Sequence, residues 1–171
     1  MLLKKGFLVL ILTSLGHIVK GQHTFVQNCV GTWKGQMYIY RSGSIKDSVE
    51  VRLTVAPMSS SGEWTWKTEY LSSKMPMVKD YKLKTKDASK GIYIIDEGDG
   101  IELINYLFDN KLYCLFETQG ISLTATYELR GEELIFEVTS GKKQATKAEV
   151  TNFSVDNLQK VVLKRANSHS K

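Results

Sequence analysis

The sequence predicts an all-β protein, an antiparallel up-and-down β-barrel of about ten strands. Three observations predict it. Apolar and polar residues alternate along many short segments, as they do in strands that bury one face. Turn residues separate these segments at short intervals. After the first 21 residues, no segment of useful length has the period of a helix. A meander with one apolar face removes its exposed edges by closing into a barrel.

The N-terminus has the features of a secretory signal peptide. Lys4 and Lys5 precede an apolar run over residues 7–15, and a charged start followed by a short apolar stretch is typical of such signals. The run is too short to cross a bilayer as a helix. Small side chains place the expected cut after Gly21. We therefore expect the protein to be secreted or periplasmic.

Domain organisation and charge follow from that cut. We divide the chain into a signal peptide over residues 1–21 and a single β-barrel domain over residues 22–171, which is the size of one domain. Removing the signal lowers the formal charge from +5 to +2, since three lysines leave and no acidic residue does. Because the remaining lysines are scattered, we expect no nucleic acid partner. Nothing after the signal resembles a transmembrane segment.

The first four predicted strands have a clean period of two. One face of each is mostly apolar and the other mostly polar, so each strand buries one side. Ser42-Gly43 and Ser61-Gly62 provide turns between the first three strands. The residues assigned to the interior are Trp33, Gly35, Met37 and Ile39, then Val49, Val51, Leu53 and Val55, then Trp64, Trp66, Thr68 and Tyr70, and finally Tyr81 and Leu83.

The middle strands are less regular. Segments 92–95, 101–107 and 112–116 carry apolar residues on both faces, as strands do when their outer face is covered. Gly98-Asp99-Gly100 and Asp109-Asn110 separate them as hairpin turns. The period of two then returns in two further strands before a last strand over residues 158–165. The interior residues of these two strands are Ile121, Leu123, Ala125, Tyr127 and Leu129, then Leu134, Phe136 and Val138.

One connection, residues 72–77, is longer than a tight turn and contains Met75, Pro76 and Met77. Flexible thioether side chains suit an adaptable apolar rim or lid. Methionines that plug the end of a barrel would leave the same pattern in the sequence. We expect at least one of the two methionines to be such a plug.

The first strand opens with Gly31-Thr32-Trp33, and here the sequence resembles the calycins, the superfamily of lipocalins, fatty-acid-binding proteins and avidins. The resemblance implies that Trp33 lies across the closed end of the barrel and that a basic residue of the last strand packs over it. We assign that role to Arg165, with Lys164 as the alternative if the register differs by one. A guanidinium on an indole face contributes about 0.5–2 kcal/mol.

The sequence also departs from each branch of the calycins. Lipocalins usually carry a helix after their eighth strand, and only residues 166–171 follow the last strand here. Fatty-acid-binding proteins place two helices between their first two strands, and residues 41–47 are too few for that. The biotin-stacking tryptophans of avidins are not visible. The resemblance therefore implies a fold and the barrel-closing pair Trp33 and Arg165, and it implies no ligand.

Cys29 and Cys114 are the two cysteines. An oxidising compartment permits a disulfide between them, which would stabilise the fold by about 4 kcal/mol in the chain-entropy model. Two buried thiols are the alternative. Separately, Asn152-Phe153-Ser154 fits the N-glycosylation pattern, which matters in a eukaryotic secretory pathway.

No residue set argues for catalysis. Two histidines remain after the expected cut, His23 and His169, and both lie near a terminus. An internal histidine is therefore not available for zinc, for haem or for a Ser-His-Asp relay. The acidic stretch over residues 96–102 lacks the spacing of a calcium loop, and a hairpin turn explains it. We predict that the protein is not an enzyme and uses no metal and no cofactor.

We expect the barrel interior to hold a small, mostly apolar ligand, because aromatic residues dominate the inward faces and few charges point inward. A cavity of about 300 Å³ or more would support this, and a smaller one would make the barrel a scaffold. One alternative is a filled barrel that meets a protein partner through loops such as 72–77. Another, less favoured, is an enzyme with polar groups such as Asn105 beside Thr68 or Tyr127. The residues predicted to line the interior are Met37, Leu53, Trp64, Trp66, Tyr70, Tyr81, Leu103, Phe116, Tyr127 and Phe136.

Overall fold

The computed structural model describes residues 21–145 and 149–166. Residues 1–20 of the predicted signal peptide lie outside this part, so the expected export remains a prediction. His169 lies outside it as well. Within the described residues, no helix has both the length and the apolar character needed to cross a membrane.

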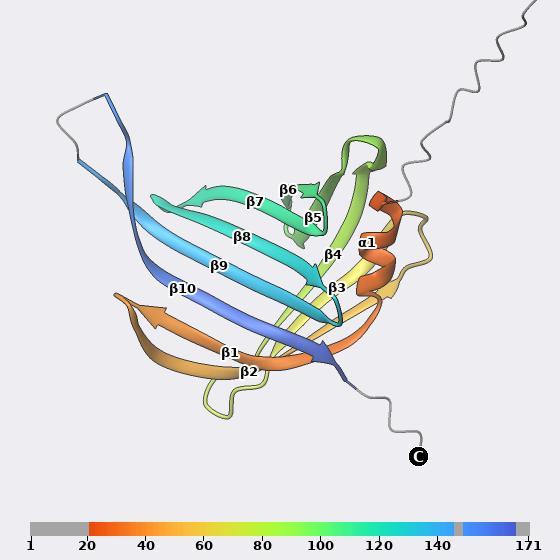
Figure 1. Cartoon of the computed structure of the whole chain (residues 1–171), viewed down its shortest axis with the longest axis horizontal. Helices are drawn as coiled ribbons and strands as arrows, with labels where there is room; N and C mark the ends of the chain where they lie inside the picture. Colours follow the sequence, from red (N-terminus) through yellow and green to blue (C-terminus); the bar gives the residue numbers. More distant parts are fainter. Residues whose placement is uncertain (1–20, 146–148, 167–171) are drawn as a thin grey trace, which may run out of the picture.

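Ten antiparallel strands form one closed barrel (Figure 1). Each strand pairs with its neighbours in sequence, and β1 pairs with β10 to close the barrel. This confirms the predicted up-and-down barrel of about ten strands. The strands are β1 (Gly31–Arg41), β2 (Ser44–Pro57), β3 (Glu63–Tyr70), β4 (Met77–Asp87), β5 (Ile92–Gly98), β6 (Ile101–Phe108), β7 (Lys111–Thr118), β8 (Ile121–Arg130), β9 (Glu133–Gln144) and β10 (Asn152–Arg165), and the 3-10 turn η1 (Ala88–Lys90) lies between β4 and β5.

The alternating sequence places its apolar half inside the barrel. On β2, Val51, Leu53 and Val55 are almost completely buried, whereas the residues between them are partly exposed. Successive side chains of a strand point to opposite faces, so one register determines which face is buried along the whole strand. At the seam of the barrel, Trp33 of β1 lies opposite Arg165 of β10.

A short helix, α1 (Gly21–Cys29), covers one end of the barrel (Figure 1). Its Phe25, Val26 and Cys29 are buried, and their spacing puts them on one face of the helix. The expectation of no helix after the signal is therefore wrong. Nine residues are too few to show a helical period in the sequence, and a helix this short depends on packing against the barrel.

Tight turns connect most of the strands. Ser42 and Gly43 have φ angles of 49° and 77°, which suits the two-residue turns that match the right-handed twist of paired strands. At η1, the Asp87 carboxylate accepts hydrogen bonds from the amides of Ser89 and Lys90. The same carboxylate accepts a 2.6 Å hydrogen bond from the Ser89 hydroxyl and pairs with the Lys90 ammonium at 2.9 Å, and these side-chain contacts lower the pKa of Asp87 to about 2.

The barrel wall is incomplete between β6 and β7. Their ladder contains three residue pairs and ends where Tyr106 lies opposite Tyr113, whereas β7 and β8 pair at eight positions. Asn105 and Cys114 are the next residues on the two strands, and both side chains are buried. Beyond this point, β6 bonds to β5 and β7 bonds to β8, but β6 and β7 do not bond to each other.

Candidate ligand-binding site

Trp33 closes the floor of the barrel beneath α1. Its side chain is fully buried, and its indole N–H donates a 2.7 Å hydrogen bond to the backbone oxygen of Cys29. The Arg165 guanidinium lies over the indole, 4.3 Å from the ring centroid. It also donates to the carbonyl oxygens of Asn28 and Val30, at 2.6 and 2.7 Å. Arg165 thereby fastens α1 to the floor through carbonyl groups that a helix leaves unpaired at its end.

Cys29 and Cys114 are both free thiols, so the candidate disulfide is not formed. Cys29 ends α1 at the floor, whereas Cys114 lies on β7 in the wall of an interior cavity. Burial raises the pKa of Cys29 to about 12, although the nearby charge of Arg165 acts to lower it. Burial and the charge of Glu97 raise the pKa of Cys114. Both thiols therefore stay protonated at neutral pH and are poor nucleophiles.

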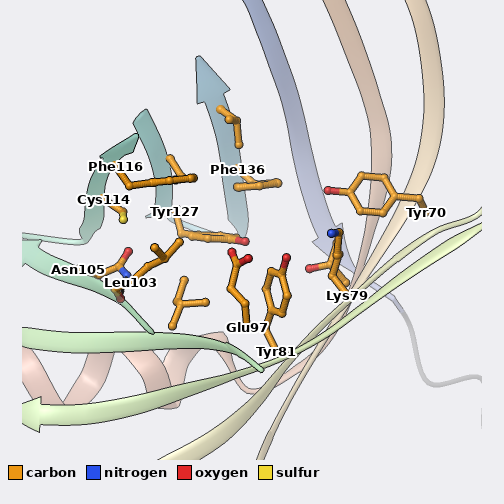
Figure 2. A pocket seen from close by; sticks show the side chains of 14 residues that line it. Tyr70, Lys79, Tyr81, Glu97, Leu103, Asn105, Cys114, Phe116, Tyr127 and Phe136 are labelled. Carbon is orange, nitrogen blue, oxygen red and sulfur yellow. Dashed lines mark hydrogen bonds between the residues drawn. The ribbon is translucent and has the colours of Figure 1, made fainter. Parts of the chain in front are cut away.

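The interior cavity has a volume of about 150 Å³ and lies in the half of the barrel away from α1 (Figure 2). Each of the seven strands from β3 to β9 contributes two residues to its wall, always at alternate positions. Most of the wall is apolar or aromatic. The residues predicted to line the interior that do line this cavity are Tyr70, Tyr81, Leu103, Phe116, Tyr127 and Phe136.

The other four predicted lining residues do not reach the cavity. Met37, Leu53 and Trp66 are at most 1% exposed and belong to the packed core, and Trp64 packs against that core. Alternation in the sequence indicates which face of a strand is inside, but not how far along the barrel the interior is filled. Trp66 still supports the cavity wall, because it meets the Tyr127 ring edge-on with centroids 5.1 Å apart.

The volume limits what the cavity can hold. It is about half of the roughly 300 Å³ at which pockets for drug-sized ligands begin, so the volume expected for a ligand-binding barrel is not reached and volume alone favours a scaffold. The cavity is therefore too small for a fatty acid or another long chain. In another protein, an engineered apolar cavity of about 150 Å³ binds benzene. The space here suits a ligand with one aromatic ring and a short substituent.

Two charged side chains, Lys79 and Glu97, also line the cavity. Neither was predicted from the sequence, because the alternation indicates few inward charges and the acidic stretch is typical of a turn. Only part of that stretch serves the turn, where the Asp96 carboxylate accepts a 3.0 Å hydrogen bond from the amide of Gly98. Glu97 follows the buried Ile95 two positions further along β5, so the period of two could have placed it inside.

Glu97 places a negative charge in the cavity wall. Figure 2 shows its carboxylate pointing toward the region of the Tyr81 and Tyr127 hydroxyls. Burial raises the pKa of Tyr81, and the charge of Glu97 and a hydrogen bond to it raise it further. Burial and the charge of Glu97 also raise the pKa of Tyr70, and burial raises that of Tyr127. These tyrosines are therefore neutral at physiological pH and can donate hydrogen bonds.

The enzyme alternative requires inward polar groups that lie close together. The cavity wall does contain such a set, namely Thr68, Asn105 and Tyr127. The Asn105 amide, however, donates to the backbone oxygen of Leu103 at 2.9 Å. Raised pKa values also take the tyrosine hydroxyls further from the range in which general acids and bases work near pH 7. Within the described ranges, no group of three or more His, Cys, Asp or Glu residues is placed to hold a metal ion. This wall is suited to holding a molecule.

The methionines of the 72–77 connection do not plug the barrel, so that expectation is wrong. Met75 is 77% exposed and Met77 is 43% exposed. The Ser72 hydroxyl accepts hydrogen bonds from the amides of Lys74 and Met75 at 3.2 and 3.1 Å. These bonds fold the connection into a local turn at the rim of the barrel.

The outer side of β6 and β7 carries an apolar surface, which we call the β6–β7 patch. Leu115 is 75% exposed in it, and the Phe108 ring lies 6.3 Å from the Tyr106 ring and 5.9 Å from the Tyr113 ring. Cys114 lines both the interior cavity and the hollow under this patch. The patch consists of Ile104, Tyr106, Phe108, Tyr113 and Leu115.

Known structures contain the same barrel. The S-type phycobiliprotein lyase CPES from Guillardia theta is similar with a TM-score of 0.58 and 8% sequence identity, over 85% of this chain and 93% of that chain. Rv2717c from M. tuberculosis is similar with a TM-score of 0.52 and 14% identity, over 85% of this chain and 98% of that chain. The chain has the calycin-like barrel fold. No protein-family model and no curated protein matches the sequence.

At 8% and 14% identity, these similarities show the fold and nothing further. The features that give this chain a calycin-like barrel are visible in its own residues. They are the alternation along ten strands, the seam between β1 and β10, and the stacking of Arg165 on Trp33.

Proposed function

We propose that the protein is an exported binding protein that holds one small, mostly apolar molecule inside its barrel, without turnover. One observation carries the proposal. The half of the barrel away from α1 contains a cavity that is walled by aromatic side chains and has a polar end at Glu97, Lys79 and the tyrosine hydroxyls. A few polar groups in an otherwise apolar pocket are the usual means of orienting a small ligand.

The cavity wall also supports binding without turnover. The Tyr127 and Phe136 rings stack with centroids 4.4 Å apart, and such packing holds the wall in a fixed shape. The structure from Guillardia theta is, by its title, a phycobiliprotein lyase. That likeness concerns the fold, and the raised pKa values of the cavity tyrosines favour retention of a molecule over acid–base chemistry.

Export is the second part of the proposal, and the charged and apolar N-terminus supports it. A cut after Gly21 would leave nearly all of α1 in the mature protein, including the buried Phe25, Val26 and Cys29. We therefore expect N-terminal sequencing of protein from the host to begin at Gln22. Protein found inside the cell with Met1 still present would contradict export.

A cavity-filling variant tests the binding function. Ala125 on β8 lines the cavity, whereas its neighbour Thr124 lies on the outer face, in the wall of the external hollow. Ala125→Leu adds three carbons to the interior and is expected to weaken binding of the probe 2-phenylethanol at least tenfold in calorimetric titrations. Thr124→Leu adds a similar side chain outside and is expected to leave the affinity unchanged. Equal effects of the two variants would refute the interior site.

An interaction module remains the second candidate function, and the β6–β7 patch favours it. The cavity is small, and the patch exposes five large apolar side chains beside a part of the wall where β6 and β7 are not paired. Unpaired strands and apolar surface together favour association with another strand, here that of a second copy. Sedimentation velocity of the wild type and of Leu115→Ser decides this point. If the wild type and the variant are both monomeric, the patch is not a self-association surface.

A further inference from the structure

We propose that the ligand is a small organic cation, an ammonium group carried on a single aromatic ring, and that Glu97 is its counterion inside the barrel. The inference rests on the proposed binding function and names the chemical class of the ligand. It is carried by the position of the Glu97 carboxylate, by the aromatic rings around it and by the size of the cavity.

The Glu97 carboxylate keeps free acceptor capacity on the cavity side. Figure 2 shows the Tyr81 hydroxyl on the same side of the cavity as this carboxylate, and Glu97 adds to the effect of burial in raising the pKa of that phenol. In the described part of the chain, no lysine, arginine or histidine nitrogen lies within 4.0 Å of its oxygens. A carboxylate can accept about four hydrogen bonds, so one phenol leaves most of this capacity unused. The Glu97 side chain is partly exposed, and a bound cation would supply the ion pair that it lacks.

Aromatic rings surround the polar end of the cavity. Tyr70 and Tyr81 stand beside it, and Tyr127 and Phe136 stack at 4.4 Å to form a flat wall (Figure 2). The electron-rich face of an aromatic ring attracts cations, and cages of aromatic side chains recognise ammonium groups in this way. The Tyr81 ring already presents a face to a cation, because the Lys79 ammonium lies 5.8 Å from its centroid.

The charge of Glu97 acts on the aromatic wall of the cavity, which also contains Lys79. Burial raises the pKa values of Tyr70, Tyr81, Cys114 and Tyr127, and the charge of Glu97 raises each of them further. A positive group that enters the cavity therefore meets an attractive field, and a carboxylate meets a repulsive one.

Three probes of nearly equal shape separate the ligand classes. They are 2-phenylethylammonium, the neutral 2-phenylethanol and the anion phenylacetate. Each combines one ring with a short substituent, which is the size that a cavity of about 150 Å³ admits. With the wild-type protein at pH 7, calorimetric titration is expected to show the cation binding at least tenfold more tightly than the alcohol, and the anion more weakly than either.

Substitution of Glu97 tests its role as the counterion. Glu97→Gln keeps the shape of the side chain and removes the charge, so the cation is expected to lose at least tenfold in affinity while the alcohol changes less than threefold. Glu102→Gln is the matched control, because it removes one carboxylate from the same hairpin at an exposed position outside the cavity wall. Lys79→Met is expected to strengthen cation binding, because it removes a competing positive charge.

The outcomes distinguish the two proposals. If the alcohol or the anion binds the wild type as tightly as the cation, or if Glu97→Gln weakens all three probes equally, the ligand class is wrong and interior binding stands. If the alcohol and the cation both fail to bind the wild type, the proposed binding function fails, and this inference fails with it. A selective loss of the cation in Glu97→Gln, with Glu102→Gln unchanged, supports the inference.

Discussion

Replacing Arg165 by methionine tests how the barrel floor is held together. The guanidinium lies 4.3 Å from the centroid of the Trp33 ring and donates hydrogen bonds to the carbonyl oxygens of Asn28 and Val30. Arg165→Met keeps an unbranched apolar stem over the indole and removes both the charge and the donors. The carbonyl oxygens of Asn28 and Val30 then lose their side-chain donor, while Trp33 still donates to Cys29, and the end of α1 is expected to open more readily.

The size of the effect follows from the contacts that are lost. A cation–π contact at a partly exposed site contributes about 0.5–1 kcal/mol. Each hydrogen bond from a charged donor contributes about 1.5–3 kcal/mol when sheltered, and we take about 1 kcal/mol for each here because Arg165 is exposed. The sum is about 2.5–3 kcal/mol, which lowers the Tm by roughly 5–12 °C in a domain of this size.

Urea and thermal unfolding, followed by circular dichroism, measure this loss. Lys164→Met is the matched control, since Lys164 is the next residue, its side chain is 75% exposed, and its amine lies 3.6 Å from the Glu133 carboxylate. A surface pair of this kind contributes less than about 1 kcal/mol. Hydrogen exchange should also show faster opening of α1 in Arg165→Met. Equal stability of the two variants would refute the role of Arg165 as the link between helix and floor.

Three further predictions concern pH, the barrel seam and the thiols. Burial raises the pKa of Tyr127, so the folded protein keeps a proton that the unfolded chain releases above about pH 10, and the free energy of unfolding falls as the pH rises. In urea titrations between pH 9 and 11, Tyr127→Phe is expected to lose less stability than the wild type. Equal losses would contradict this. Gly35→Ala is expected to destabilise the protein by about 1–3 kcal/mol, because a Cβ there would lie 2.3 Å from the backbone oxygen of Val162. An unchanged urea midpoint would mean that β1 and β10 move apart enough to accommodate the added methyl group. Cys29 and Cys114 are buried and have raised pKa values. Neither should therefore react with Ellman's reagent at pH 8 until the protein unfolds. Rapid reaction of the native protein would show that one of the two thiols is accessible.

Local patterns in the sequence were sufficient for most of the strands and for the seam. The last strand is an exception, because it begins at Asn152 and not at the predicted residue 158, continuing through an irregularity between Val155 and Asn157. In β3, the alternation from Trp64 to Tyr70 depends only on neighbouring residues, and the pleat converts it directly into an inner and an outer face. The pairing of the last strand with the first was expected because a meander with one apolar face avoids open edges by closing. The Gly-x-Trp resemblance then indicated Trp33 for the floor, and Arg165 lies over it.

Features that depend on packing over a distance were not predictable in the same way. The helix α1 is short and exists through its contacts with the barrel, so its residues carry no clear period. Trp66 and Leu103 have the same inward orientation in their strands, yet Trp66 lies in the filled core and Leu103 lines the cavity. Depth along the barrel decides this difference, and alternation contains no information on depth. The missing pairs between β6 and β7 likewise depend on how two whole strands are placed.

Glu97 is a different case, because the signal was present. It stands two positions after the buried Ile95, and continued alternation would have placed it in the interior. The nearby glycines and the other acidic residues favoured a turn over the whole stretch, and Asp96 and Gly98 do form that turn. A single charged residue at an inward position of a strand is therefore expected to point into the interior, as the apolar residues before it do.

A small molecule is expected to bind inside the barrel, between Glu97 and the stacked rings of Tyr127 and Phe136. An NMR titration of the ¹⁵N-labelled protein with 2-phenylethylammonium locates the bound molecule. Saturable shift changes are expected, and they should be largest at the amides of residues lining the cavity, such as Glu97 and Ala125. Shift changes confined to the outward residues of the β6–β7 patch, or no saturable changes, would contradict it.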